Sequence, residues 1–197
     1  MEENIPQLYG LVLAGGKSTR MGSDKGLIDY HGVPQREYLY ALLNDLCDKV
    51  YMSVRDKQQA TELTGFDCIL DNNQHRGPFN GILSAHRTFP QVAWLVLACD
   101  LPLLDADTLR ILVKNRDDRK IATSFATNES GLPEPLVTIW EPEGLEQSLT
   151  YLKTAESSCP RKFLINSDIH MVHPEHDEVL YNANSLADYQ FAKSKIG

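Results

Sequence analysis

The sequence predicts an α/β fold in three layers, with a mostly parallel central sheet covered by helices on both faces. Short apolar runs alternate along the chain with segments whose apolar residues recur at helical spacing. Glycine, proline and aspartate separate these segments, as is typical of turns and helix caps. Such alternation of strands and helices implies right-handed crossovers, which place successive strands parallel in one sheet.

The first part of the chain predicts three strands and two helices. Tyr9–Leu13 is a short apolar run that stops before two glycines, which predicts a buried strand. Pro34 opens a helix, because proline fits the first helical turn. Lys49–Val54 is the second predicted strand, and Asp56 can cap a short helix after it. Phe66–Leu70 is the third predicted strand.

The same alternation continues in the rest of the chain. Gly77–Arg87 begins as a turn and becomes a helix, and Trp94–Asp100 is the most apolar strand of all. Asp105 caps a helix with leucines on one side. Ile121–Ala126 and Leu136–Trp140 predict two more strands, separated by a loop with glycine and proline. The last two predicted helices are Gly144–Lys153 and Ser185–Lys195.

We expect one domain over residues 1–197, because this length buries a substantial core and no linker, repeat or low-complexity segment interrupts it. The 42% hydrophobic and 23% charged residues are typical of soluble globular proteins. The apolar runs are too short to span a bilayer, and the N-terminal MEENIPQLYG lacks the features of a signal peptide. Four cysteines without CxxC spacing favour reduced thiols and a cytoplasmic protein. A net charge of −8 argues against a nucleic-acid partner.

Ligands of parallel α/β sheets bind beyond the carboxyl ends of the strands. This rule selects the loops that follow Leu13, Leu70 and Ala98. In the first loop, Gly15 and Gly16 let a ligand approach the main chain, and successive amide groups form an anion site.

Three cations, Lys17, Arg20 and Lys25, follow these glycines closely in an acidic chain. Arg20 offers a fork of donors to phosphate oxygens, and Lys25 offers a mobile point charge. We therefore predict a site for a nucleoside triphosphate, although neither a Walker A loop nor a GxGxxG motif is present. A glycine turn with solvated cations is the alternative.

Asp100 ends the predicted strand Trp94–Asp100, so its carboxylate is expected at the carboxyl edge of the sheet, beside the phosphates. Two anions repel there unless a divalent cation lies between them, and Mg²⁺ prefers few carboxylates, several waters and phosphate oxygens. Such a metal polarises the α-phosphate. The alternative is that Asp100 only serves the turn before Leu101-Pro102.

Three further polar positions have both a functional and a structural interpretation. Asp71 accepts hydrogen bonds from a base or ribose, or starts a turn. Asn182 and Asn184 are two apart, so in an extended segment both point to one face, where they orient a phosphate or assist the metal. Otherwise they form a turn before the last helix, with Ser185 as its cap.

These residues carry a resemblance. Leu13-Ala14-Gly15-Gly16, Ser18, Arg20-Met21-Gly22 and Asp24-Lys25 resemble the LAGGxSxRMGxDK signature of nucleotidyltransferases, and the Ala-Gly-Gly is most similar to the molybdenum cofactor guanylyltransferases. The resemblance continues in order through Gly32-Val33-Pro34, Asp71, Gly77-Pro78, Gly81, Cys99-Asp100-Leu101-Pro102, Pro133-Glu134-Pro135-Leu136 and Asn182-Ala183-Asn184. It covers nearly the whole chain and implies a three-layer Rossmann-like nucleotidyltransferase fold.

The resemblance also implies an activity. GMP is transferred from GTP to molybdopterin or molybdenum-molybdopterin, and pyrophosphate is released. Mg²⁺ is the implied cofactor, with Mn²⁺ as the alternative, and Asp100 is its implied ligand. The N-terminal half is expected to bind the nucleotide, and the region from Ser130 to Asn184 the acceptor. Transient contacts with proteins that deliver molybdopterin or accept the finished cofactor are expected, but contacts with nucleic acid or membrane are not.

Individual roles follow from the same resemblance. The implied catalytic residues are Lys25, Asp100 and Arg20. The implied nucleotide-binding residues are Leu13, Ala14, Gly15, Gly16, Lys25, Ser53, Asp71 and Asp100, and the implied acceptor-binding residues are Pro135, Asn182 and Asn184. Two positions depart from the family pattern. Ser53 replaces an asparagine, which bears on the choice of base, and Gln35 replaces a leucine, which changes helix packing.

Other interpretations are weaker. A nucleotidyltransferase that uses CTP or a sugar 1-phosphate shares the signature, and a non-catalytic GTP-binding protein shares the fold. The presence of both Lys25 and Asp100 argues against the latter. His170, His173 and His176 invite a zinc site, but Pro174 interrupts any helix there and HExxH is absent. A solvated loop is the favoured interpretation of these histidines.

Overall fold

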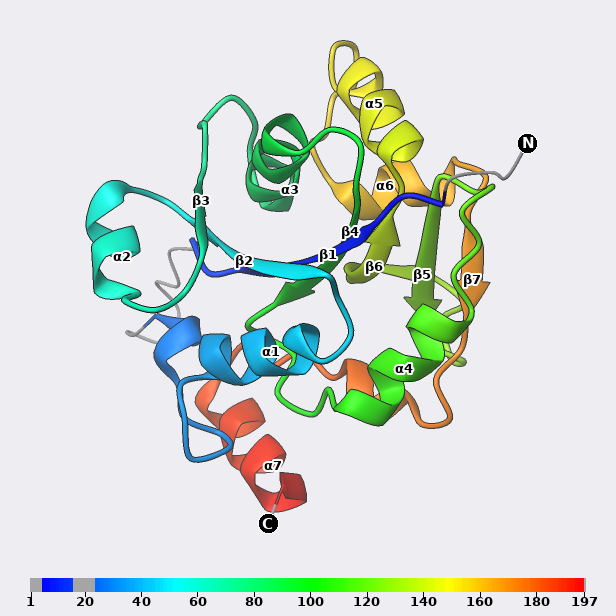
Figure 1. Ribbon diagram of the computed structural model, residues 1–197. Helices are drawn as coiled ribbons and strands as arrows, with labels where there is room; N and C mark the ends of the chain where they lie inside the picture. The colour runs from blue at the N-terminus through cyan, green and yellow to red at the C-terminus, as the bar shows by residue number, and fades with distance from the viewer. Residues whose placement is uncertain (1–4, 16–23, 197) are drawn as a thin grey trace.

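A seven-stranded sheet forms the centre of the computed structural model, which describes residues 5–15 and 24–196. The strand order is β3-β2-β1-β4-β6-β5-β7 (Figure 1). The strands are β1 (Leu8–Leu13), β2 (Lys49–Val54), β3 (Cys68–Leu70), β4 (Ala93–Ala98), β5 (Ala122–Ala126), β6 (Pro133–Trp140) and β7 (His170–Val172). β6 pairs antiparallel with β4 and β5, and the other pairings are parallel. The predicted α/β fold with a mostly parallel sheet is confirmed.

Helices cover both faces of this sheet. The described helices are α1 (Gln35–Asn44), α2 (Lys57–Glu62), α3 (Pro78–Thr88), α4 (Ala106–Lys114), α5 (Pro142–Tyr151), α6 (Pro160–Ile165) and α7 (Leu186–Ile196), with 3-10 turns η1 (Lys25–Leu27) and η2 (Asp177–Leu180). Figure 1 shows α3, α5 and α6 on one face, α1 and α4 on the other, and α7 beyond α1. None of the described helices is long and apolar enough to cross a membrane.

Local sequence explains where the helices next to the site begin. The carboxylates of Asp56 and Asp105 accept hydrogen bonds from the first turns of α2 and α4, at 2.9 Å and 2.8 Å, as their positions predicted. α3 begins after Gly77, whose φ of 63° lies in the region that favours glycine. β4 ends at Ala98, so Cys99 and Asp100 belong to the loop that follows rather than to the strand.

Besides the 3-10 turns η1 and η2, one short helix and one short strand escaped prediction. α6 has six residues and β7 has three, too few for a periodic pattern to appear. β7 contains His170, which pairs with Thr123 of β5, so the assignment of this histidine to a solvated loop was wrong. His173 bonds through its Nδ1 to the backbone oxygen of Ala126, at 3.0 Å. Within residues 5–15 and 24–196, no group of three or more histidine, cysteine or acidic residues is placed to hold a metal ion.

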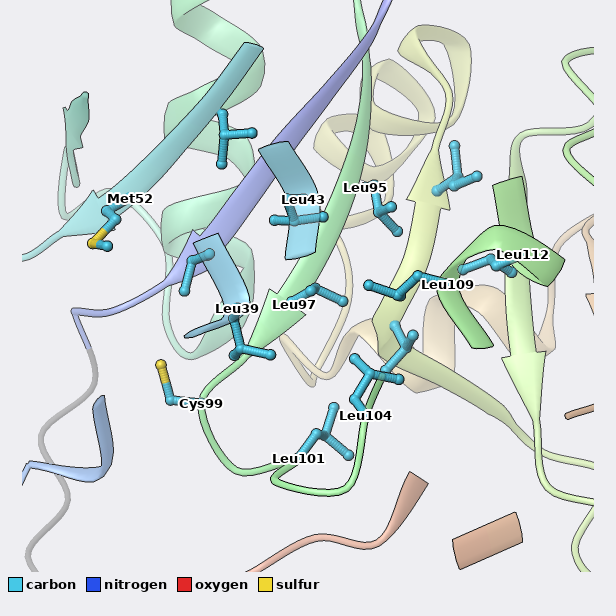
Figure 2. Close-up of a cluster of buried hydrophobic side chains, with 14 of the residues drawn as sticks. Leu39, Leu43, Met52, Leu95, Leu97, Cys99, Leu101, Leu104, Leu109 and Leu112 are labelled. Carbon is cyan, nitrogen blue, oxygen red and sulfur yellow. The ribbon is translucent and has the colours of Figure 1, made fainter. Parts of the chain in front are cut away.

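Two apolar clusters hold the layers together. One lies between the sheet and the α1/α4 face, where Leu39 and Leu43 of α1 pack towards β4 and α4 contributes Leu109 and Leu112 (Figure 2). The other lies under α3, α5 and α6 and contains the paired Trp94 and Trp140, both fully buried. Burial of apolar side chains on both faces is what a parallel sheet needs, and it leaves the strand ends as the place for a ligand.

Candidate active site

A pocket of about 650 Å³ opens at the carboxyl ends of β1, β2, β3 and β4. Its wall includes Gly15 after β1, Asp71 after β3 and Asp100 after β4. The three loops chosen by the sheet-edge rule therefore meet at one pocket, as predicted. Its volume is in the range of small-molecule sites.

The first wall of the pocket is the backbone that leaves β1. Ala14 donates its backbone N–H to the backbone oxygen of Ser53 at 3.0 Å, and the side-chain amide of Gln59 of α2 donates to the backbone oxygen of Ala14 at 2.7 Å. A Cβ on Gly15 would lie 3.0 Å from Asp71 Oδ2, so a glycine keeps this approach open. Leu13, Ala14 and Gly15 all line the pocket. The other predicted residues of this loop, Gly16 and Arg20, lie outside the described residues.

Lys25, from η1, and Asp100, from the loop after β4, both line this pocket. Asp24 caps η1 by accepting the N–H of Gly26 at 2.9 Å, which fixes the turn that carries Lys25. Lys25 Nζ donates to Asn184 Oδ1 at 2.6 Å and lies 3.6 Å from Asp100 Oδ2. The side chains of Lys25 and Asp100 are only 20% and 22% exposed. Residues far apart in the chain thus form a charged cluster in the pocket wall.

Asp100 also offers an unused oxygen. Its Oδ1 is buried and has no hydrogen-bond partner among the described residues. A buried carboxylate oxygen is costly unless a donor or cation approaches it. A hard divalent cation that keeps waters and phosphate oxygens as its other ligands suits one such carboxylate. The donor set therefore fits Mg²⁺ bound together with a nucleotide.

Asp71 follows β3, whereas Asp100 follows β4, and β2 and β1 lie between these two strands in the sheet. Asp71 therefore lies at the other end of the pocket from Lys25 and Asp100. Ser53 donates its hydroxyl to Asp71 Oδ1 at 2.6 Å, and Asp71 donates its backbone N–H to the backbone oxygen of Val54. Burial raises the pKa of the Asp71 carboxyl, and hydrogen bonds from Ser53 and Asn80 partly oppose that rise. A Cβ on Gly81 would lie 2.3 Å from Ser53 Oγ, so close packing holds the hydroxyl in place. One carboxylate oxygen is thereby engaged by the protein.

A second pocket of about 540 Å³ adjoins the first, and both are lined by Gly77, Pro78 and Leu136. The predicted acceptor residues Pro135 and Asn182 line this second pocket. Asn184 lines the first pocket instead. The two asparagines therefore line two adjoining pockets, and the prediction that they act on one bound phosphate or metal stays a prediction.

The second pocket carries a charged pair on its wall. Arg161 donates to Glu134 Oε2 at 2.6 Å and to the backbone oxygen of Pro133 at 3.0 Å. Burial raises the pKa of Glu134, and the charge of Arg161 opposes that rise. Cys159, at the start of α6, has an exposed free thiol.

The turn before the last helix, with Ser185 as the cap of that helix, is present as predicted. Ser185 Oγ accepts the N–H of Asp188 at 3.2 Å, and Asp188 Oδ2 accepts the N–H of Ser185 at 2.8 Å. This reciprocal pair is a capping box for α7. Asn184 thus serves both interpretations, because it precedes the cap and bonds to Lys25.

Several residues of the site were missed from the sequence. Gln59, Asn80 and His75 lie at the first pocket or support its wall, yet no motif marks them. Gln35 was expected only to alter helix packing. It is fully buried and donates to the backbone oxygen of Leu101 at 3.3 Å, so it ties α1 to the loop that carries Asp100.

The fold and the pocket together define a class of enzyme that aligns phosphates. A mostly parallel sheet covered by helices on both faces carries Lys25 and Asp100 beyond its strand ends, 3.6 Å apart. That class is the nucleotidyltransferases. A family model described as the MobA-like NTP transferase domain matches residues 10–171. The chain belongs to this family.

Known proteins agree with this assignment. The chain is 38% identical, over 92% of its length, to a molybdenum cofactor biosynthesis bifunctional protein of Synechocystis sp., and it spans only 52% of that relative's length. It is 28% identical to a probable molybdenum cofactor guanylyltransferase of Nostoc sp., over 92% of this chain and 88% of the relative. The solved structure of molybdopterin-guanine dinucleotide biosynthesis protein A from Archaeoglobus fulgidus has the same fold. It is 21% identical, with a TM-score of 0.75 over 95% of this chain and 97% of that one.

Proposed function

We propose that this chain transfers GMP from GTP to molybdopterin or molybdenum-molybdopterin, releasing pyrophosphate and forming the guanine dinucleotide form of the cofactor. The names of its relatives support this choice of substrates. The structural observation that carries the proposal is the pair of adjoining pockets, with Lys25, Asp100 and Asn184 in the wall of the first. A transfer between two bound phosphates needs this arrangement.

The nucleotide is assigned to the first pocket. Its triphosphate lies along Gly15 and Lys25, and its base lies towards Asp71, whose Oδ1 is already engaged by Ser53. Guanine presents two neighbouring N–H donors, at N1 and at the 2-amino group, which suit a carboxylate acceptor. We assign the choice of GTP to this carboxylate. Leu13, Ala14 and Gly16 complete the proposed nucleotide site.

The acceptor is assigned to the second pocket. Pro135 and Asn182 line it, and Arg161 places a half-exposed cation on its wall. An acceptor bound there presents its terminal phosphate across Leu136 towards Lys25 and Asp100, since Leu136 lines both pockets.

The chemistry needs alignment and charge compensation rather than a protein nucleophile. The acceptor phosphate is ionised at neutral pH and attacks the α-phosphorus of GTP, while the bond to the leaving pyrophosphate breaks. Lys25, held by Asn184, places its ammonium where negative charge grows, and Arg20 is proposed to assist it. Asp100 would hold Mg²⁺, or Mn²⁺ in its place, and the bound metal would supply Lewis-acid stabilisation of that charge.

The test is an assay of pyrophosphate release with GTP, CTP, ATP and UTP against a panel of acceptors that includes molybdopterin. We expect release with GTP and molybdopterin. Faster release with CTP, or with a sugar 1-phosphate, would replace the guanylyl assignment within the same family. Nucleotide binding without release for any acceptor would favour a non-catalytic protein.

The metal is tested separately with Asp100→Asn, which keeps the shape and removes the charge. We expect turnover to fall at least about a hundredfold at saturating Mg²⁺, because a carboxamide oxygen is a far weaker ligand for a hard cation. Asp107→Asn is the matched control, since Asp107 lies on α4 with its side chain 90% exposed. If the turnover of Asp100→Asn showed the wild-type Mg²⁺ midpoint and maximum, Asp100 would not be a ligand of the metal.

A cytoplasmic location and transient contacts with cofactor-handling proteins remain predictions.

A further inference from the structure

Helix α3 holds the loop that joins Asp71 to its own first turn. Asn72 donates its backbone N–H to Ser84 Oγ at 2.9 Å, and that hydroxyl donates to the backbone oxygen of Asn80 at 2.6 Å. His75 donates its backbone N–H to Asn80 Oδ1 at 3.4 Å. Asn80 and Ser84 are one helical turn apart in α3, so both lie on one face of the helix. The loop after β3 is therefore tied to α3 at two places.

The contact with His75 determines which way the Asn80 amide faces. A side-chain amide has one accepting oxygen and one donating NH₂ group. Because the oxygen of Asn80 accepts the N–H of His75, its NH₂ group remains to donate. The Asn80 side chain forms a hydrogen bond with the Asp71 carboxyl group, and this bond opposes the rise that burial causes in the pKa of Asp71. Asn80 therefore donates to Asp71 and stabilises its charged form.

Two neutral donors from different elements hold this carboxyl group. Ser53 of β2 donates to Asp71 Oδ1 at 2.6 Å, and Asn80 of α3 is the second donor. Asp71 and Asn80 both line the first pocket. Glu134 and Glu141, which are more deeply buried, pair instead with arginines. In the described part of the chain Asp71 forms no ion pair, so no protein cation competes there with the donors of a bound base.

We propose that Asn80 is a positioning residue for the choice of base, because it fixes the plane of the Asp71 carboxylate together with Ser53. This inference rests on the proposed assignment of guanine to Asp71. The N1–H and 2-amino donors of guanine are satisfied together only when both carboxylate oxygens lie near the plane of the base. Each carboxylate oxygen has two lone pairs, so the bonds from Ser53 and Asn80 leave acceptor positions for guanine. Without Asn80 the carboxylate can turn and keep only one bond to the base.

Calorimetry of GTP, ITP and CTP with Mg²⁺ and no acceptor tests this in the wild type, Asn80→Ala and Asn80→Ser. ITP lacks the 2-amino group, so it can form only one of the two bonds. The wild type should bind GTP at least about tenfold more tightly than ITP, since the lost bond is to a charged group. In Asn80→Ala, GTP affinity should fall at least about fivefold and ITP affinity less than about twofold. Asn80→Ser also removes the amide and should give the same result, including when the alanine variant does not fold.

A second measurement separates positioning of Asp71 from general support of the pocket. If Asn80 acts through Asp71, its removal should change GTP affinity by less than about twofold in the Asp71→Asn background. Asn115→Ala is the matched control, because Asn115 is exposed and its amide donates within the chain segment of α4, to the backbone oxygen of Ile111 at 2.8 Å. This control should bind all three nucleotides as the wild type does.

An affinity ratio of GTP to ITP that stays within about twofold of the wild-type ratio in both Asn80 variants would overturn the proposal. So would an equal loss of GTP affinity in the wild-type and Asp71→Asn backgrounds, because that result assigns Asn80 to general support of the pocket. If the wild type bound GTP and ITP equally, or CTP more tightly than GTP, the assignment of guanine to Asp71 would be wrong, and the role of Asn80 with it.

Discussion

Replacing Asp71 by asparagine should change which purine the pocket prefers. The variant keeps the shape of the side chain, and Ser53 can still donate to Oδ1 at the 2.6 Å seen for the carboxylate. The variant should weaken or lose the proposed charge-assisted bonds from guanine N1–H and the 2-amino group. One hydrogen bond to a charged group contributes about 1.5–3 kcal/mol, so GTP affinity should fall about tenfold to a hundredfold. Xanthine carries a carbonyl in place of the 2-amino group, and the carboxamide NH₂ can donate to it.

The assay is calorimetry of GTP and XTP with wild type and Asp71→Asn. We expect the wild type to prefer GTP and the variant to prefer XTP. Asp67→Asn is the matched control, because Asp67 is exposed at the opposite end of β3. A GTP to XTP affinity ratio that is unchanged in Asp71→Asn would refute the assignment of Asp71 to the base.

The same variant should be more stable than the wild type at neutral pH. Burial raises the pKa of Asp71 in the folded protein above its unfolded value. The folded state therefore binds the proton more tightly, and stability is lost as pH rises from the unfolded pKa through the folded pKa. The asparagine variant has no such loss, so its advantage in unfolding free energy should be present at pH 7 and vanish below about pH 4. Denaturant unfolding at several pH values measures this, and a less stable variant at pH 7 would contradict it.

Three further outcomes are expected. Lys25→Ala should lower kcat about a hundredfold or more, since loss of one donor to a developing anion costs about 2.7–4 kcal/mol. The melting temperature should change little, because the side chain is partly exposed. Near-normal turnover would show that Lys25 is a solvated cation without a role in catalysis. Gly81→Ala should displace the Ser53 hydroxyl, which a new Cβ would approach to 2.3 Å, and lower GTP affinity with a stability loss of about 1–3 kcal/mol. Arg116→Met should cost about 3–5 kcal/mol of unfolding free energy, because it leaves the carboxylate of Glu141 buried and unpaired, while GTP affinity stays unchanged.

The elements that could be predicted are those whose signals are local. β2 matches its predicted bounds, and Asp56 and Asp105 cap the helices that follow them, because an alternating or apolar run and a capping aspartate act within a few residues. The sheet-edge rule then located the pocket without any knowledge of side chains. The direction of β6 was not specified in advance, because a strand's neighbours are chosen by packing across the whole sheet.

The supporting residues of the site could not be predicted for a related reason. Ser53 was predicted as a nucleotide-binding residue and noted as a departure from asparagine, but its hydrogen bond to Asp71 across two strands was not predicted. Gln35 and Arg36 lie at positions where a helix facing the core usually carries apolar residues, and only the packed structure reveals which polar groups their burial leaves unsatisfied. The spacing of residues in the sequence predicts which of them share a face of one helix or strand. These contacts instead join elements that are far apart in the chain.

The Asn182–Asn184 segment shows where a periodic argument fails and what replaces it. Alternation puts residues two apart on one face only in a regular strand, and this segment is neither strand nor helix. Ala183, only 1% exposed, donates its N–H to the backbone oxygen of Asp100 at 2.8 Å. That bond anchors the segment at the junction of the two pockets, so that Asn184 reaches Lys25 on one side while Asn182 lines the other. The contacts that place these two asparagines are therefore a backbone bond to a distant loop and a side-chain bond to a distant turn, and neither follows from the spacing of residues along the segment.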